Sequence, residues 1–356
     1  MERLAQTLVV ITAGIDLSVG MIFLLTNCLA SWIVVGTPLE TALGAVAVLL
    51  AGVACGALNG AIVIYGRLQP IVATIATGAI FYGLALLLRP FPGGSVNEDL
   101  ADALTGRLFG VVPASLVALL AVVLLVWVPF RRSVLGRAAY ASGSSEVAAY
   151  MSGVPIRRGK FAAYTLAGLL AAMGGLFLTF FTYTGEAALA SGNTYTLFSI
   201  AAVVLGGVSL FGGRGSAIGA IFGALAFRTI GDLLFVFDLD PLWQPLFQGV
   251  MLLVAVSQRT AEIGLLKALG ATRQDIKRLF LLETLWLALA GAGVGIALGY
   301  AGSLGLRLAY PQLPAYPPAW ASLAAIATAI LTGIAASLLP ASRAARLNPV
   351  LALSKR

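Results

Sequence analysis

The sequence predicts an all-α fold: a polytopic transmembrane helical bundle with about ten spans. Of its 356 residues, 60% are hydrophobic and only 10% are charged, which is too little polar surface to coat a water-soluble globule of this size. Apolar stretches recur along the whole chain, each close to the ~20 residues that a helix needs to cross about 30 Å of hydrocarbon. The chain is therefore expected to lie in a lipid bilayer.

The hydropathy pattern, broken at glycines, prolines and charge clusters, places the spans. They are expected at 4–34, 39–64, 69–90, 112–130, 161–184, 195–211, 217–235, 242–257, 281–309 and 319–340. All but four of the 22 lysines and arginines (Arg89, Arg107, Arg228 and Arg307) fall in or beside alternate loops. Because cytoplasmic loops are enriched in these residues, loop 131–160 and both termini are expected in the cytoplasm. The net charge of +8 is explained in the same way, so no nucleic-acid partner is expected.

The first span is overlong and is interrupted by Gly14-Ile-Asp-Leu-Ser-Val-Gly20, which predicts two half-helices. A carboxylate at membrane depth is costly, so Asp16 should face protein, water or free backbone N–H groups rather than lipid. Two roles remain open. Asp16 or Ser18 could cap the second half-helix, or Asp16 could line a path through the bundle.

Small residues recur at helical spacing, as in Gly52-Val-Ala-Cys-Gly56-Ala-Leu-Asn-Gly60, and such faces let membrane helices approach closely. Asn59 on this face is expected to form an interhelical hydrogen bond, with a substrate contact as the alternative. Cys28 and Cys55 lie in apolar segments and are interpreted as packing residues. The chain has no histidine, so neither a metal site nor a cofactor is expected.

The cytoplasmic stretch from Gly136 to Gly153 contains a short helix-forming core that is too short to span a membrane. A short helix bounded by glycines on both sides suits a rigid docking element, because glycine permits sharp entry and exit. An ordinary interfacial loop would explain the composition equally well. The residues alone leave these two alternatives open.

Four motifs in order resemble the permease family of ribose- and monosaccharide-type bacterial ABC importers, over about residues 7–257. They are Gly14-Ile-Asp-Leu-Ser-Val-Gly20, Gly56-Ala-Leu-Asn-Gly60 followed by Gln69-Pro-Ile-Val-Ala-Thr74, the loop from Gly136 to Gly153, and Ile200-Ala-Ala-Val-Val-Leu-Gly-Gly-Val-Ser-Leu-Phe-Gly-Gly-Arg-Gly-Ser216. The chain departs from the family in beginning late, as though an opening helix were missing, and in having Ser144 where the family usually has asparagine.

The resemblance implies a multi-pass permease of the bacterial inner membrane that pairs with a second permease copy, docks cytoplasmic ABC ATPase subunits and receives sugar from a periplasmic sugar-binding protein. The implied ATPase-coupling residues are Gly136, Arg137, Tyr140, Gly143, Glu146, Ala148, Ser152 and Gly153. The residues implied for the pathway or the helix break are Asp16, Ser18, Asn59, Gly206 and Gly207. The chain has no Gly-x-x-x-x-Gly-Lys-Ser/Thr loop, so ATP hydrolysis is expected from a partner and not from this chain.

The last hundred residues resemble a different class of ABC permease, that of macrolide exporters, lipoprotein-release permeases and the cell-division permease. The similarity rests on Arg259-Thr-Ala-Glu-Ile-Gly-Leu-Leu-Lys-Ala-Leu-Gly-Ala-Thr-Arg273 and on Pro340-Ala-Ser-Arg-Ala-Ala-Arg-Leu-Asn-Pro-Val-Leu-Ala-Leu353. A second coupling helix is implied at Glu262, Gly264, Lys267, Gly270 and Arg273, with a membrane-surface helix as the alternative. The expected domains are an importer-type permease over 1–257 and an exporter-permease-like segment over 258–356.

Three functions are compatible with this pattern to different degrees. Monosaccharide import by alternating access is favoured. Export or extraction of lipids, lipoproteins, peptides or macrolides is the alternative, although that class carries a large periplasmic domain and no outside loop here exceeds about 20 residues. An intramembrane aspartyl protease would require Asp16 and Asp232 to face each other, and neither lies in a Gly-x-Gly-Asp setting. No catalytic residue is expected.

Overall fold

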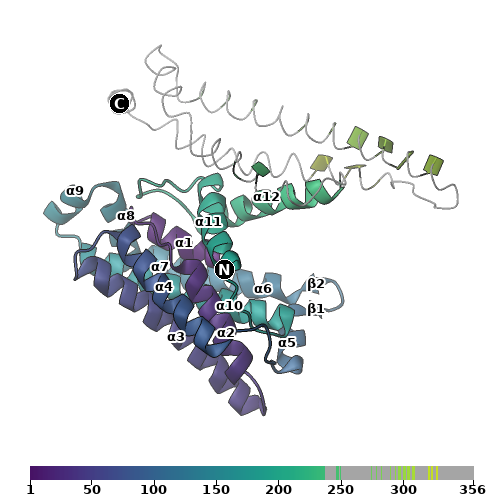
Figure 1. Cartoon of the computed structure of the whole chain (residues 1–356). Helices are drawn as coiled ribbons and strands as arrows, with labels where there is room; N and C mark the ends of the chain where they lie inside the picture. The colour runs from purple at the N-terminus through teal and green to yellow at the C-terminus, as the bar shows by residue number, and fades with distance from the viewer. Residues whose placement is uncertain are drawn as a thin grey trace. The chain divides into compact units, whose positions relative to one another are not determined.

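The computed structural model describes residues 1–236 continuously, and beyond them only isolated helical positions between 246 and 327. The chain separates into two compact units, Met1–Ala255 and Val256–Arg356. The description below concerns the first unit (Figure 1). Three of the expected spans, 242–257, 281–309 and 319–340, lie outside the continuously described residues.

The described part is almost entirely helical, as predicted. Its helices are α1 (Glu2–Val10), α2 (Val19–Ile33), α3 (Pro38–Ile64), α4 (Pro70–Leu88), α5 (Glu98–Thr105), α6 (Ala114–Val122), a π-helical turn (Val123–Trp127), α7 (Val128–Arg132), α8 (Val134–Ser144), α9 (Glu146–Met151), α10 (Ile156–Thr182), α11 (Leu189–Leu205) and α12 (Ala217–Val236). A minimal antiparallel ladder pairs β1 (Arg107–Leu108) with β2 (Val112–Pro113).

Four helical segments among the described residues are long and apolar enough to cross a membrane: Pro38–Ile64, Pro70–Leu88, Ala114–Arg132 and Ile156–Thr182. The burial pattern of α3 is the reverse of that in a soluble bundle. In α3 the buried positions include Gly44, Gly52, Gly56 and Asn59, whereas Leu39, Leu43 and Leu50 are exposed by 60% or more. Large apolar side chains on the outside suit lipid contact. The number of spans and the sides of the termini stay predictions.

Local sequence explains where several of these helices begin. Thr37 forms a capping box with Glu40, in which each side chain accepts the other residue's backbone N–H, and Pro38 occupies the first turn of α3, where its missing N–H is harmless. Pro70 does the same for α4. Pro129 follows the π-helical turn, in which the N–H of Val128 bonds the carbonyl oxygen of Val123, five residues back.

Helix α10 is the centre of the first unit and packs against α1, α2, α3 and α8 (Figure 1). Its contact with α3 depends on glycine. A Cβ added at Gly168 would lie 2.1 Å from the carbonyl oxygen of Gly52, and one added at Gly56 would lie 2.3 Å from that of Tyr164. Since real Cβ atoms do not approach so closely, this seam requires the small-residue face that the sequence presents.

Candidate functional site

The expected first span, 4–34, is interrupted between α1 and α2, as the sequence predicts. Helix α1 ends at Val10 and α2 begins at Val19. Ala13 between them has a φ of 61°, a left-handed backbone that is uncommon outside glycine. The break places Asp16 inside the protein, where it is only 1% exposed.

Asp16, Ser18 and Asn59 form one hydrogen-bonded cluster. Ser18 donates to Oδ1 of Asp16 through its backbone N–H at 2.8 Å and through its hydroxyl at 2.6 Å. Nδ2 of Asn59, from α3, donates to the Ser18 hydroxyl oxygen at 2.7 Å and to Oδ2 of Asp16 at 3.4 Å. Both carboxylate oxygens are therefore hydrogen-bonded, which offsets the cost of burying the group. The predicted interhelical hydrogen bond of Asn59 is present.

Two threonines from distant helices satisfy the backbone around this break. Oγ1 of Thr196, from α11, accepts the N–H of Gly20 at 3.0 Å, and Oγ1 of Thr74, from α4, accepts the N–H of Leu17 at 3.0 Å. Ser18 occupies the N-cap position of α2, but its side chain makes no capping hydrogen bond. The expectation that Ser18 caps α2 through its side chain is therefore wrong, because the N–H of Gly20 is bonded by Thr196 instead. Asp16 does accept one N–H at the start of α2, that of the N-cap residue Ser18.

Two buried polar atoms at the cluster have no hydrogen-bond partner among the described residues: Oδ1 of Asn59 and the hydroxyl of Tyr164. Tyr164 lies against the break, because a Cβ at Gly14 would be 2.8 Å from its hydroxyl oxygen. A buried polar atom left unpaired costs about 1–3 kcal/mol. Such atoms in a native structure mark a site under strain or one that takes up a further polar group.

Sequence reasoning found Asp16, Ser18 and Asn59 but missed Thr74, Thr196 and Tyr164. Thr74 ends the motif that begins at Gln69, which was a usable signal. Tyr164 lies in a long apolar segment where nothing local distinguishes it, and Thr196 follows the polar run Ser191-Gly-Asn-Thr-Tyr195, in which no single residue stands out. Only the packing of α4, α10 and α11 around the break brings them to the cluster.

The stretch from Gly136 to Gly153 forms two helices, α8 and α9, not one short helix bounded by glycines. Gly136 and Gly143 are inside α8, and only Gly153, with a φ of +71°, follows the end of α9. This prediction is therefore wrong in its boundaries. Arg137, Glu146, Ala148, Ser152 and Gly153 are exposed, Tyr140 is partly buried, and Gly136 and Gly143 are buried.

The buried end of α8 lies against the break between α1 and α2. A Cβ at Gly143 would lie 2.0 Å from the carbonyl oxygen of Ile11 and 2.4 Å from the backbone nitrogen of Gly213. Gly213 itself donates its N–H to that oxygen of Ile11 at 2.8 Å. The Tyr140 hydroxyl donates to the carbonyl oxygen of Gly215 at 2.8 Å. We call this meeting of α8, residues 11–13 and loop 206–216 the glycine junction.

Gly206 and Gly207 end α11. Gly207 has a φ of +76° and donates its N–H to the carbonyl oxygen of Val204, while Val208 donates to that of Val203. These two bonds are the Schellman pattern that commonly closes a helix. A Cβ at Gly206 would lie 2.1 Å from the carbonyl oxygen of Gly219 in α12. The predicted span 195–211 is therefore displaced, because this glycine pair ends the helix at Leu205.

The residues of the second coupling helix, Glu262, Gly264, Lys267, Gly270 and Arg273, lie outside the described residues. So does the junction between the two expected domains.

Apolar helices of membrane length, a helix broken inside the bundle and an exposed two-helix loop define the class: a helical membrane permease. The family model described as branched-chain amino acid transport system / permease component matches residues 4–256. The chain belongs to this family. A second model, FtsX-like permease C-terminal, matches residues 245–349. Both resemblances predicted from the sequence are confirmed: that of the longer N-terminal part to importer-type ABC permeases and that of the C-terminal part to a second class of ABC permease.

Curated relatives agree with the family. The chain is 35% identical over 254 residues to the ribose import permease protein of Bacillus subtilis, an alignment that covers 70% of this chain and 78% of that protein. It is 34% identical over 261 residues to the fructose import permease protein of Rhizobium meliloti, covering 71% and 72% respectively. Identity to the ribose import permease protein of Escherichia coli K12 is 34% over 258 residues, covering 70% and 78%. No solved structure matches the chain significantly.

Proposed function

We propose that this chain is the permease subunit for ATP-driven import of a monosaccharide across the bacterial inner membrane. The names of its relatives, which are ribose and fructose import permeases, support this substrate class. The proposed partners are cytoplasmic ABC ATPase subunits, a second permease copy and a periplasmic sugar-binding protein. ATP hydrolysis is assigned to the ATPase partner.

The observation that carries the proposal is a continuous chain of contacts from the exposed loop to the buried break. Helix α9 presents Val147, Tyr150 and Met151, which are exposed by 72%, 78% and 83%. Helix α8 precedes α9 in the chain and is separated from it by Ser145. Gly143 of α8 lies against the backbone of Ile11. The break beyond Ile11 holds Asp16 and Asn59. A force applied to α9 therefore has a packed route to the polar cluster.

In this proposal α9 is the ATPase-docking helix and α8 transmits its movement. Three large exposed apolar side chains on one six-residue helix are unfavourable in water and suit a protein partner. Residues Arg137, Glu146, Ala148, Ser152 and Gly153 surround that surface, whereas Gly136, Tyr140 and Gly143 hold α8 in place. Movement at the glycine junction would shift the broken segment between α1 and α2 from one conformation to another, and alternating access requires two such conformations.

Uptake by the complete transporter tests the proposal. The full chain would be reconstituted in proteoliposomes with its ATPase subunits and binding protein, and uptake of radiolabelled D-ribose and D-fructose measured with and without ATP. We expect ATP-dependent uptake of at least one sugar. Failure of both sugars, together with ATP-dependent movement of a macrolide or lipid in the opposite direction, would contradict it.

A substitution in the cluster tests the role of the break. Asp16→Asn removes the charge but keeps a similar shape, and it leaves Ser18 and Asn59 with weaker hydrogen bonds. We expect sugar uptake to fall by about tenfold or more, because one such charge-assisted bond is worth roughly 1.5–3 kcal/mol. The variant should still assemble with the ATPase subunits as the unmodified protein does. Asp99→Asn, an exposed acid on α5, is the matched control and should leave uptake unchanged.

The match over residues 245–349 supports a second proposal, that 258–356 is an exporter-permease-like domain added to an importer-type core over 1–257. If its amphipathic segment contacts an ATPase, Lys267→Glu in the full-length protein should lower ATPase stimulation in the assembled transporter. If uptake and ATPase activity are both unchanged, α9 is sufficient for coupling and the second contact is not used.

A further inference from the structure

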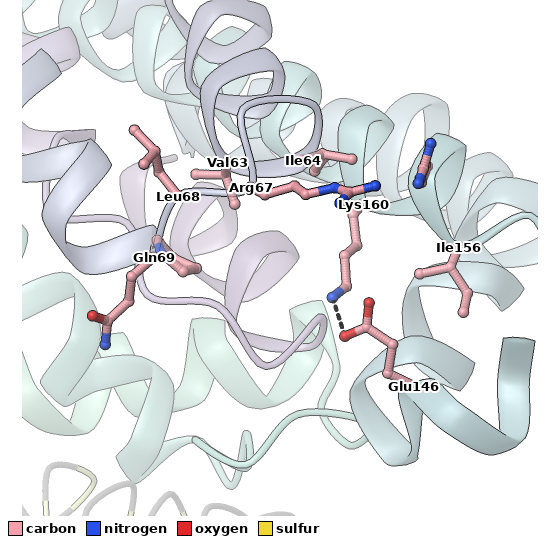
Figure 2. Close-up of a pocket in the computed structure, with 10 residues that line it drawn as sticks. Val63, Ile64, Arg67, Leu68, Gln69, Glu146, Ile156 and Lys160 are labelled. Atoms are coloured by element: carbon pink, nitrogen blue, oxygen red, sulfur yellow. Dashed lines mark hydrogen bonds and ion pairs between the residues drawn. The ribbon is translucent and has the colours of Figure 1, made fainter.

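A cavity of 560 Å³ lies at one end of the bundle, outside the cluster and the glycine junction (Figure 2). It is formed by the end of α3, the loop between α3 and α4, the first residue of α9 and the start of α10. Its lining residues are Val63, Ile64, Arg67, Leu68, Gln69, Pro70, Glu146, Ile156, Arg157 and Lys160.

The cavity carries an excess of positive charge. Three of its lining residues, Arg67, Arg157 and Lys160, are cations, and Glu146 is its only acid. Nζ of Lys160 bonds Oε2 of Glu146 at 2.6 Å (Figure 2), so that pair is neutral. Neither arginine side chain forms a hydrogen bond or ion pair with any residue that the structure describes. Two uncompensated guanidinium groups therefore share one cavity.

Arg67 is held there by an unusual backbone. Its φ is +55°, in the left-handed region that costs a residue with a Cβ roughly 1–2 kcal/mol. Glycine would be the ordinary residue at such a position. Figure 2 shows the Arg67 side chain crossing the opening near Lys160. Strain of this kind that is retained in a site suggests that the side chain has a use there.

The cavity also has an apolar wall and lies where membrane helices end. Val63, Ile64 and Ile156 belong to two of the helices long enough to span a bilayer, Pro38–Ile64 and Ile156–Thr182, and the third, Pro70–Leu88, begins at the cavity. Tyr65 beside it is 58% exposed, and its ring centroid is 5.9 Å from that of Phe161. Tyrosine at such a level is typical of the interface between hydrocarbon and headgroups.

We propose that this cavity binds the phosphate headgroup of an anionic phospholipid, with the acyl chains against the apolar wall. Arginine guanidinium groups pair with phosphate through two parallel hydrogen bonds, and basic pockets between membrane helices are suited to anionic headgroups. The site lies next to Glu146 at the beginning of α9, so a bound headgroup would stabilise the loop that contains α9.

Native mass spectrometry of the full-length protein, released from nanodiscs, tests this site. The lipids would be dioleoyl phosphatidylglycerol and dioleoyl phosphatidylcholine in equal amounts. We expect phosphatidylglycerol to be retained preferentially by the unmodified protein. Arg67→Gln and Arg157→Gln should each lower that retention by about tenfold, which corresponds to about 1.4 kcal/mol and is ordinary for one charge-assisted bond.

The neighbouring arginine gives a matched control. Arg158 is exposed and carries the same charge on the same turn of α10, but it does not line the cavity. Arg158→Gln should therefore retain phosphatidylglycerol as the unmodified protein does. Equal losses for Arg157→Gln and Arg158→Gln would show general surface attraction and overturn the site. So would unchanged retention in both cavity variants, or displacement of the lipid by inorganic phosphate, which would identify a free anion as the ligand.

Discussion

The tripeptide Ala-Ala-Tyr occurs twice between Gly136 and Gly153, once in α8 and once in α9, and the two copies are buried to different extents. In α8, Ala138 and Ala139 are 1% and 0% exposed, and the tyrosine that follows bonds a backbone carbonyl in loop 206–216. In α9, Ala148 is exposed and Tyr150 is 78% exposed. Ala149 of α9 is 6% exposed, so the tripeptide buries both alanines in α8, whereas in α9 it buries only the second alanine and exposes the first alanine and the tyrosine. The difference supports the proposed roles of the two helices, which are packing for α8 and ATPase docking for α9.

Glutamate placed at the first alanine of each Ala-Ala-Tyr copy, Ala138 in α8 and Ala148 in α9, should give the largest difference, and Ala138→Glu should have the largest effect on stability. Ala138→Glu would bury a carboxylate next to Gly159, whose added Cβ would already lie 2.7 Å from Ala138 Cβ. An unpaired buried charge costs several kcal/mol, a large part of the 5–15 kcal/mol that stabilises a typical domain. We expect loss of monodisperse protein on size-exclusion chromatography in detergent.

Ala148→Glu should behave in the opposite way. The position is exposed, so stability should change by less than about 0.5 kcal/mol, while ATP-driven sugar uptake should be lost because the new charge lies on the docking surface. Normal uptake by well-folded Ala148→Glu protein would remove α9 from the coupling proposal. Loss of folding in both variants would instead abolish the contrast between the two helices.

A smaller effect is expected from Gly143→Ala. Its added Cβ would meet Ile11 and Gly213 at 2.0 and 2.4 Å, and overpacking of this kind typically costs about 1–3 kcal/mol. Gly83→Ala in α4 is the control, because nothing lies within 4 Å of its added Cβ and alanine favours a helix. Thermal unfolding in detergent should show a lower Tm for the first variant only. A bulky charged residue at position 143 would therefore test packing rather than docking.

Removing one hydroxyl from each copy should give a still smaller difference. Tyr140→Phe deletes the hydrogen bond to the carbonyl oxygen of Gly215, at a cost of about 0.5–1.5 kcal/mol. Tyr150→Phe removes an exposed hydroxyl and should leave the Tm unchanged. If the two variants unfold at the same temperature, the bond to loop 206–216 contributes nothing to the glycine junction.

The smallest effect is expected from the ion pair that links α9 to α10. Glu146 is 60% exposed, and exposed ion pairs are worth roughly 0–1 kcal/mol and are screened by salt. Glu146→Gln should lower the Tm slightly at low ionic strength and not at all at high ionic strength. A large, salt-independent loss would mean that α9 is held far more firmly than its exposure indicates.

Much of the architecture follows from the chain's own chemistry. The expected spans 39–64 and 69–90 differ by no more than two residues from Pro38–Ile64 and Pro70–Leu88, because Pro38 and Pro70 mark helix starts and polar residues mark their ends. The broken first span followed from one carboxylate and its flanking glycines. The end of α11 was missed, since the apolar residues after Gly207 continue the hydropathy signal although the backbone has turned.

The site divides in the same way. Asp16 was identifiable because a carboxylate in an apolar run must find partners, and Asn59 because an amide on a glycine face points toward another helix. Thr74 could have been singled out because it ends the motif that begins at Gln69. Thr196 and Tyr164 could not be assigned, because threonine and tyrosine are unremarkable in membrane helices until their neighbours are known. The glycine junction was equally hidden, since a glycine's space is set by residues distant in sequence.

By itself the sequence determined that this protein is a membrane-embedded helical permease of the ABC type, because composition, the lysine and arginine bias and motif order require no three-dimensional knowledge. Only the tertiary structure decided how far Tyr140 and Tyr150 are exposed, which atoms hold Asp16, and that Arg67 and Arg157 share a cavity. The physical reason is that hydropathy and helix signals are properties of neighbouring residues, whereas burial and hydrogen bonding depend on which helices pack together.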